Sequence, residues 1–262
     1  MTSNEVQGRE KAREFRRVHK LGDGPLADLV ELLANAAGID VVVMDAADSE
    51  HGLTMVDPLR GVTVVAVATT RSSARQRSSM AHELAHVLWN DEDLDALELY
   101  GRQSDSEIRA NAFARHLLLP LAAVRTLTTS GDKVDDMVSL LVQRFDVSPH
   151  IAAIQLREAH RVSAETCGTY ARVSAGQLAA RHGWLDLHKQ RSETASRPRS
   201  PQRLLARATA GYVAGVISIN ELADWAGESP EELEADLRRE GISREVAVEP
   251  VEVDDDPFPP VA

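Results

Sequence analysis

Two histidines four residues apart, with a glutamate directly after the first, are the residues of this sequence best suited to chemistry. They are His82, Glu83 and His86, in the pattern H-E-x-x-H. If the stretch is helical, both imidazoles lie on one face about one turn apart, where they can bind one zinc ion. Glu83 would then lie beside the ion and could act as general base on a water molecule. The pattern therefore predicts a zinc-dependent hydrolytic site.

So short a pattern also occurs by chance, in a helix that carries two half-exposed histidines and no metal. The flanks favour the metal site, because their apolar residues would give the helix buried sides that support it. These residues are Met80, Ala81, Leu84, Ala85, Val87 and Leu88. Ser73 followed by Gln76 is a capping-box pattern, which predicts a helix over 74–89 that ends at Asn90.

A catalytic zinc site needs a third protein ligand besides the two histidines. Glu107 is the best candidate, because it lies at the start of a second predicted helix, from about Asp105 to Leu119, which could return against the first. Asn111 lies one helical turn after Glu107 and could hydrogen-bond a metal ligand. The second helix is therefore expected to complete the site.

Spacing alone leaves alternatives open for the third ligand and for the group that stabilises the oxyanion. Ser104-x-x-Glu107 is itself a capping box, so Glu107 could merely cap its own helix. The rival ligands are Glu92, Glu98 and Asp105. By residue type, the candidates for the oxyanion are Tyr100, His116 and His150, and the sequence favours none of them.

The composition indicates a soluble globular protein that works inside the cell. Of the 262 residues, 43% are hydrophobic and 27% are charged. The formal net charge of −12 argues against nonspecific binding to nucleic-acid phosphates and would suit a basic protein partner. Cys167 is the only cysteine, which excludes an intrachain disulfide and a thiolate-rich zinc site. The sequence contains no recognisable signal peptide or membrane span, so we expect a cytoplasmic protein.

Apolar spacing and chain breakers predict a mostly helical α+β fold. Short β-branched runs predict strands at Ile39–Met44 and Val62–Ala68. The predicted parts, in order, are an N-terminal arm (1–24), a core (25–165), a connecting region with a basic linker (166–200), a C-terminal helical region (201–245) and an acidic, disordered tail (246–262). The arm is expected to be a solvated helix or loose, and 186–203 to be irregular.

Within the core, about 132–160 is predicted to form a helix-turn-helix-like pair. Such a pair could bind DNA, and it carries Arg144 and Arg157. It also carries Asp146 and Glu158, and the whole chain is acidic. We therefore expect the pair to pack on the core and not to bind DNA directly.

Several ordered blocks of this sequence resemble the ImmA/IrrE family of metallopeptidases. The blocks are Arg75-Gln-Arg-Ser-Ser-Met-Ala-His82-Glu83-Leu-Ala-His86, Glu107-x-x-Ala110-Asn111-x-Phe113-Ala114, Leu117-Leu-Leu-Pro120 and Arg144-Phe145-Asp146-Val147-Ser148. The resemblance covers roughly residues 25–165 and is specific, because the blocks occur in the order that the family shows.

This resemblance implies a gluzincin-like peptidase core, in which a small sheet accompanies the H-E-x-x-H helix, followed by the helix-turn-helix-like pair. It implies that His82, His86 and Glu107 bind zinc and that Glu83 is the catalytic base. It thus supports Glu107 over the rival ligands. Manganese is the alternative ion, since sites that contain a carboxylate accept both metals.

The resemblance further implies an intracellular endopeptidase that cleaves an XRE-type helix-turn-helix transcriptional repressor. Such cleavage relieves repression in phage or mobile-element induction, or in a DNA-damage response. Only about 25 residues precede the first core helix, so we expect the repressor to be a separate partner protein. The alternatives are a non-proteolytic regulatory module that binds and displaces a repressor, and a DNA-binding regulator. The sequence does not predict the oligomeric state.

Overall fold

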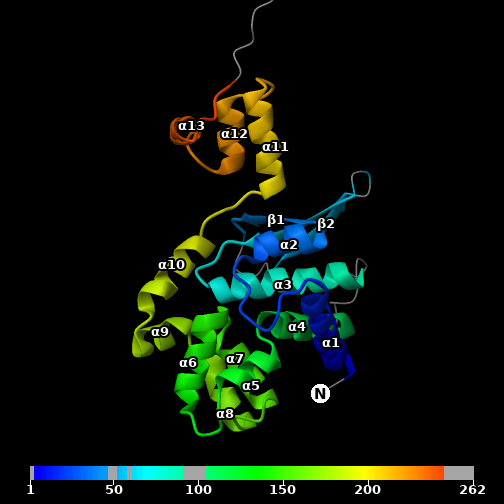
Figure 1. Cartoon of the computed structure of the whole chain (residues 1–262), viewed down its shortest axis with the longest axis vertical. Helices are drawn as coiled ribbons and strands as arrows, with labels where there is room; N and C mark the ends of the chain where they lie inside the picture. The colour runs from blue at the N-terminus through cyan, green and yellow to red at the C-terminus, as the bar shows by residue number, and fades with distance from the viewer. Residues whose placement is uncertain (1–2, 47–51, 58, 60, 91–103, 245–262) are drawn as a thin grey trace, which may run out of the picture. The chain divides into compact units, whose positions relative to one another are not determined.

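The structure, a computed structural model, describes residues 3–46, 52–57, 59, 61–90 and 104–244 (Figure 1). The chain divides into two compact units, Met1–Arg199 and Ser200–Ala262. The described residues are mostly helical with one small sheet, which confirms the predicted α+β class. The first unit contains α1 (Ser3–Val18), α2 (Leu29–Ala37), β1 (Ile39–Met44), β2 (Leu53–Asp57), β3 (Val62–Ala68), α3 (Ser73–Trp89), α4 (Asp105–Leu118), α5 (Leu121–Leu127), α6 (Val134–Phe145), α7 (Pro149–Glu158), α8 (Ala164–Thr169), the 3₁₀ helix η3 (Tyr170–Arg172), α9 (Ala175–His182) and α10 (Leu185–Ala195).

The sheet has the strand order β1-β3-β2, with β3 parallel to β1 and antiparallel to β2. β1 and β3 form with their predicted bounds. β2 is not predicted, because it is only five residues long and its apolar residues do not alternate regularly with polar ones. The outer edge of β1 is paired at Val43, which exchanges backbone hydrogen bonds of 2.8 Å with Arg199. Among the described residues, β2 is therefore the open edge of the sheet.

Helix α3 lies between the sheet and α4 (Figure 1). It buries Ala81, Leu84 and Ala85 completely, one or two residues from each histidine of the motif. At the contact with α4, the ring of Trp89 packs edge-to-face on Phe113, with ring centroids 5.9 Å apart. Burial of these apolar faces holds the two helices side by side.

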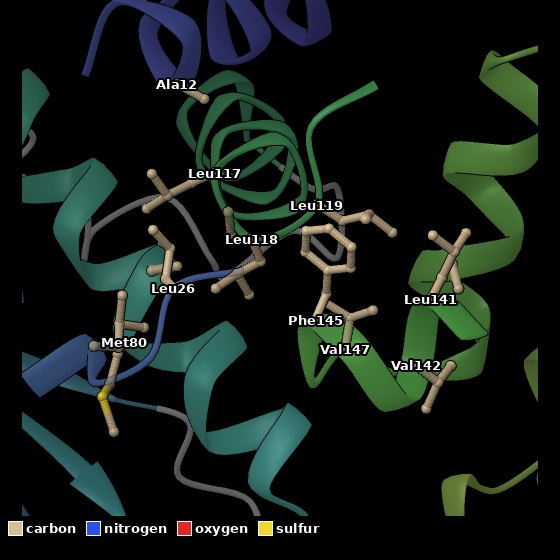
Figure 2. Packing of buried hydrophobic residues seen from close by; sticks show 14 of the residues in the cluster. Ala12, Leu26, Met80, Leu117, Leu118, Leu119, Leu141, Val142, Phe145 and Val147 are labelled. Atoms are coloured by element: carbon tan, nitrogen blue, oxygen red, sulfur yellow. The ribbon is translucent and has the colours of Figure 1, made fainter. Parts of the chain in front are cut away.

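The N-terminal segment forms helix α1, which packs along α4 and corrects the expectation of a solvated helix or loose arm. Its buried residues recur at helical spacing as Gly8, Ala12 and Phe15, and Figure 2 shows Ala12 at the contact with α4. Only Phe15 is large, so the apolar face is weak in the sequence. The guanidinium of the buried Arg16 fixes this contact, because it donates two hydrogen bonds, of 2.6 and 2.8 Å, to the carbonyl oxygen of Leu117.

Replacing Gly8 by alanine is expected to destabilise the first unit, although alanine is the better helix former. A Cβ at Gly8 would lie 2.4 Å from the backbone oxygen of Arg109 and 2.7 Å from the Cβ of Ala112, so α1 would have to move away from α4. We expect a loss of roughly 1–3 kcal/mol in the free energy of unfolding, measured by chemical denaturation.

Gly211 in α11 (Gln202–Val213) provides the matched control for this prediction. A Cβ there would meet the side chain of Ile217 at 3.7 Å, an ordinary contact, so Gly211→Ala should be neutral or stabilising. A Gly8→Ala protein as stable as wild type would show that α1 does not pack on α4 as described.

The predicted helix-turn-helix-like pair is α6 and α7, joined at Asp146, which has a left-handed φ of 52°. Figure 2 shows Phe145 and Val147 beside Leu119, which follows the end of α4. The second helix buries Pro149, Ala152, Ala153, Gln155 and Leu156. A helix that reads DNA exposes its face to the groove, so this burial favours a packing role for α7.

The basic segment 186–203, predicted to be irregular, is helical over Leu185–Ala195 as α10. Its end is tied to α3, because the side-chain amide of Gln76 donates to the carbonyl oxygens of Ala195 at 2.9 Å and of Ala68 at 3.2 Å. Ala195 is the only residue that α10 buries, so the helix lacks the apolar periodicity that would reveal it.

The second unit contains α11, α12 (Ile219–Ala226) and α13 (Pro230–Arg239), packed around Ala208, Tyr212 and Leu222. Ser218 and Glu221 form the predicted capping box of α12. The acidic tail predicted over 246–262 lies outside the described residues. Across the described part of the chain, every helix is too short or too polar to span a membrane.

Candidate metal centre

Helix α3 begins one residue earlier than its sequence suggests. Ser72 caps it by accepting a hydrogen bond from the backbone N–H of Arg75 at 3.3 Å. The capping box predicted at Ser73 and Gln76 does not form. The Ser73 hydroxyl instead donates to the carboxylate of Asp146 at 2.7 Å, which ties the start of α3 to the turn between α6 and α7.

The two histidines of the motif lie one turn apart in the second half of α3. Their ring centroids are 4.7 Å apart, and their side chains are 20% exposed for His82 and 16% for His86. The helix ends at the predicted Asn90, which has a left-handed φ of 56°. The imidazoles are therefore held on a supported helix face and still reach solvent.

Glu107 lies in the first turn of α4 and points toward both histidines. Ser104 caps the helix by accepting from the backbone N–H of Glu107 at 3.3 Å. The carboxylate does not complete a capping box, because Oε2 lies 3.3 Å from Nε2 of His82 and Oε1 lies 3.1 Å from Nε2 of His86. The geometry thus favours the role of metal ligand over that of helix cap.

The three side chains converge with a spacing that suits a metal ion. The Nε2 atoms of His82 and His86 are 3.0 Å apart, and the ligand atoms of these histidines and Glu107 all lie within 4.8 Å of one another. Ligands about 2.05 Å from a tetrahedral zinc ion are about 3.3 Å apart, close to the distances found here. Within the described ranges this is the one such group of His, Cys, Asp and Glu side chains.

The histidines also set the protonation of the carboxylate. Hydrogen bonds from His82 and then His86 hold the pKa of Glu107 well below its usual range, against the opposing effect of burial. Glu107 is therefore ionised at neutral pH, as a carboxylate ligand must be.

Glu83 is 9% exposed and lies against β2. The hydroxyl of Thr54 donates to its Oε2 at 2.8 Å. At Gly52, a Cβ would lie 2.6 Å from Oε1, so this glycine leaves room for the carboxylate. Sequence reasoning missed both residues because it did not predict β2. The available signal was a threonine within the apolar run that follows Gly52.

Of the rival acidic ligands, the structure describes Asp105 alone, and Asp105 does not join the triad. Asp105 is exposed, and its carboxylate accepts a hydrogen bond of 2.6 Å from the side chain of Asn4. Glu92 and Glu98 lie outside the described residues. Asn111 is exposed one turn after Glu107, and its hydrogen bond to a ligand stays a prediction.

Of the candidates for the oxyanion, the structure describes His116 and His150 and places neither at the triad. His116 is buried, with its ring nitrogens 3.2 Å from the side chain of Gln155 and 3.4 Å from that of Glu158. His150 is exposed on α7. Tyr100 lies outside the described residues. His116 therefore serves the core contact between α4 and α7.

Residues 34–157 match the family model described as the IrrE N-terminal-like domain. This range contains α3, α4 and all three side chains of the triad. It forms a domain of the ImmA/IrrE peptidase family, which confirms the resemblance seen in the sequence.

One solved structure that is similar to this chain is a Mycobacterium tuberculosis transcriptional regulator, with a TM-score of 0.38 and 22% sequence identity. The alignment covers 60% of this chain and 47% of that chain, so the chain spans about half the length of this protein. The comparison with curated proteins found no match.

Proposed function

We propose that this chain is a zinc-dependent metallo-endopeptidase in which His82, His86 and Glu107 hold the ion and Glu83 is the general base. The observation that carries the proposal is the convergence of the three ligand atoms within 4.8 Å, together with a second carboxylate, that of Glu83, which follows His82 in the chain and is held separately by Thr54. Three protein ligands leave one tetrahedral position for the reacting group, as catalytic zinc sites require. The peptidase family of residues 34–157 supports the same reaction class.

In the proposed hydrolysis, the metal ligands and Glu83 have separate roles. A divalent ion held by the three ligands supplies a Lewis acid that polarises the scissile carbonyl and lowers the pKa of water. Glu83 takes a proton from the water molecule as its oxygen attacks the carbonyl carbon. Glu83 then gives that proton to the amide nitrogen as the carbon–nitrogen bond breaks, so the products are a carboxylate and a free amine.

The open edge of β2 supports a polypeptide as substrate. Three of its side chains are apolar and exposed, at 57% for Leu53, 50% for Met55 and 44% for Val56. An extended peptide would pair with this edge through main-chain hydrogen bonds, while its side chains contact the exposed residues. Because Thr54 of the same strand bonds to Glu83, such a peptide would lie beside the general base.

The proposed substrate is an XRE-type helix-turn-helix repressor. This proposal rests on the family and on the acidic chain, whose net charge of −12 suits a basic DNA-binding protein. We expect co-expression of the chain with a candidate XRE-type repressor to release a reporter from repression and to produce repressor fragments. Glu83→Gln should do neither, because it removes the base.

The same experiment separates the proteolytic function from its alternative. Equal loss of repression with wild type and Glu83→Gln, without fragments by mass spectrometry, would mean that the chain binds and displaces the repressor. Fragments with both proteins would mean that Glu83 is not the base.

A further inference from the structure

The described contacts of the Glu83 carboxylate come from β2 and from the residue before it, which carry no part of the H-E-x-x-H motif. One carboxylate oxygen accepts the hydroxyl hydrogen bond of Thr54 at 2.8 Å. The other lies against the backbone at Gly52, where a Cβ would be 2.6 Å away. Both carboxylate oxygens are thus placed by Thr54 of β2 and by Gly52, the residue before this strand.

We propose that Thr54 and Gly52 position the carboxylate of Glu83 for proton transfer, which makes the edge strand β2 part of the catalytic site. The inference rests on the proposed function, since it concerns the base of that reaction. Thr54 and Gly52 are positioning residues and act only through Glu83.

The physical need for such support follows from the side chain of Glu83. Glutamate has three rotatable side-chain bonds, and a general base must lie within about 2.6–3.2 Å of the atom that gives up the proton. A misplacement of about 1 Å can lower a rate by about a hundredfold. A buried carboxylate also requires hydrogen-bond donors to offset its lost hydration. One hydroxyl at a fixed position meets both needs.

Thr54 is suited to this role by its place in the sheet. It pairs with Val65 of β3, a fully buried residue, so its backbone is fixed by the ladder. Its β-branched side chain has few χ1 rotamers, which keeps the hydroxyl aimed in one direction. Serine keeps the hydroxyl and valine keeps the shape, so the two substitutions separate hydrogen bonding from packing.

The test uses the full chain loaded with zinc and the repressor that is cut in co-expression. We expect Thr54→Val to lower kcat about tenfold with KM within about twofold, because the backbone edge that would pair with substrate is unchanged. Thr54→Ser should restore most of kcat. Gly52→Ala should lower kcat at least as much, because the added Cβ displaces the carboxylate.

Zinc affinity provides a readout that is independent of activity. Competition with a chromophoric chelator should give the same affinity, within about twofold, for wild type, Thr54→Val and Gly52→Ala, because neither residue supplies an atom to the triad. Thr63→Val on β3 is the matched control and should change neither kcat nor zinc affinity.

The outcomes distinguish this inference from the function on which it rests. Unchanged kcat in Thr54→Val and Gly52→Ala, with Glu83→Gln inactive, would overturn the positioning role alone. A fall of kcat in Thr54→Ser with full kcat in Thr54→Val would also overturn it, because the shape of the side chain and not its hydroxyl would then matter. Full activity of Glu83→Gln, or no cleavage by wild type, would overturn the proposed function and this inference with it.

Discussion

Replacing Glu83 by glutamine is expected to abolish peptide cleavage while leaving metal binding intact. The amide has nearly the shape of the carboxylate, so it fits beside Gly52 and can still accept the hydrogen bond from Thr54. It cannot accept a proton from water, which is the role proposed for the base. General base catalysis contributes about 10²- to 10⁴-fold, so we expect kcat to fall by that factor in assays with purified repressor.

The controls for Glu83→Gln are its zinc content and its fold. Glu83 contributes no atom to the group formed by His82, His86 and Glu107, so the variant should bind zinc as tightly as wild type within about twofold. Circular dichroism should be unchanged. A variant that loses its zinc would instead make Glu83 a ligand, and a variant with full kcat would assign the base to another group.

Replacing Glu107 by glutamine is expected to weaken metal binding strongly and to lower activity with it. Its carboxylate is the charged member of the triad and lies 3.1 and 3.3 Å from the two Nε2 atoms. The free energy of zinc binding to structural sites is about 10–16 kcal/mol, and about four ligands contribute to it. Losing one ligand should therefore weaken zinc affinity roughly a hundredfold or more, which competition with a chelator would measure.

Asp105 provides the matched control for Glu107, because it is an acidic residue in the same first turn of α4. Its carboxylate accepts from Asn4 and is outside the triad, so Asp105→Asn should leave zinc affinity and kcat within about twofold of wild type. Equal losses in the two variants would indicate a general effect of acidic charge and would contradict a specific ligand role for Glu107.

The parts of the fold that the sequence predicts are those with strong local signals. The strands β1 and β3 are buried β-branched runs, and α3, α4 and α7 start or end at residues whose capping roles are plain. The segments missed or misread bury few apolar side chains. β2 is an exposed edge, α10 buries only Ala195, and α1 contacts α4 mainly through Gly8, Ala12 and Phe15. Their structure depends on tertiary contacts that single-sequence periodicity does not contain.

The same distinction applies to the site. His82 and His86 are four residues apart on one helix, so their common face follows from helix geometry alone. In the sequence, Glu107 is one of several acidic residues that could supply the third ligand. The structure shows that its carboxylate lies beside both histidines. The threonine after Gly52 is visible in the sequence, but its contact with Glu83 could not be predicted, because the contact joins residues 29 apart and needs the register of β2 on β3.

Intact-mass spectrometry of purified repressor incubated with the zinc-loaded chain tests the central claim most directly. We predict two fragments whose masses sum to that of the repressor plus one water, formed by wild type. They should be absent with Glu83→Gln and absent when a chelator removes the metal. The same fragments with Glu83→Gln or with chelator, or an intact repressor with zinc-loaded wild type, would contradict the assignment of a metallopeptidase that uses Glu83 as its base.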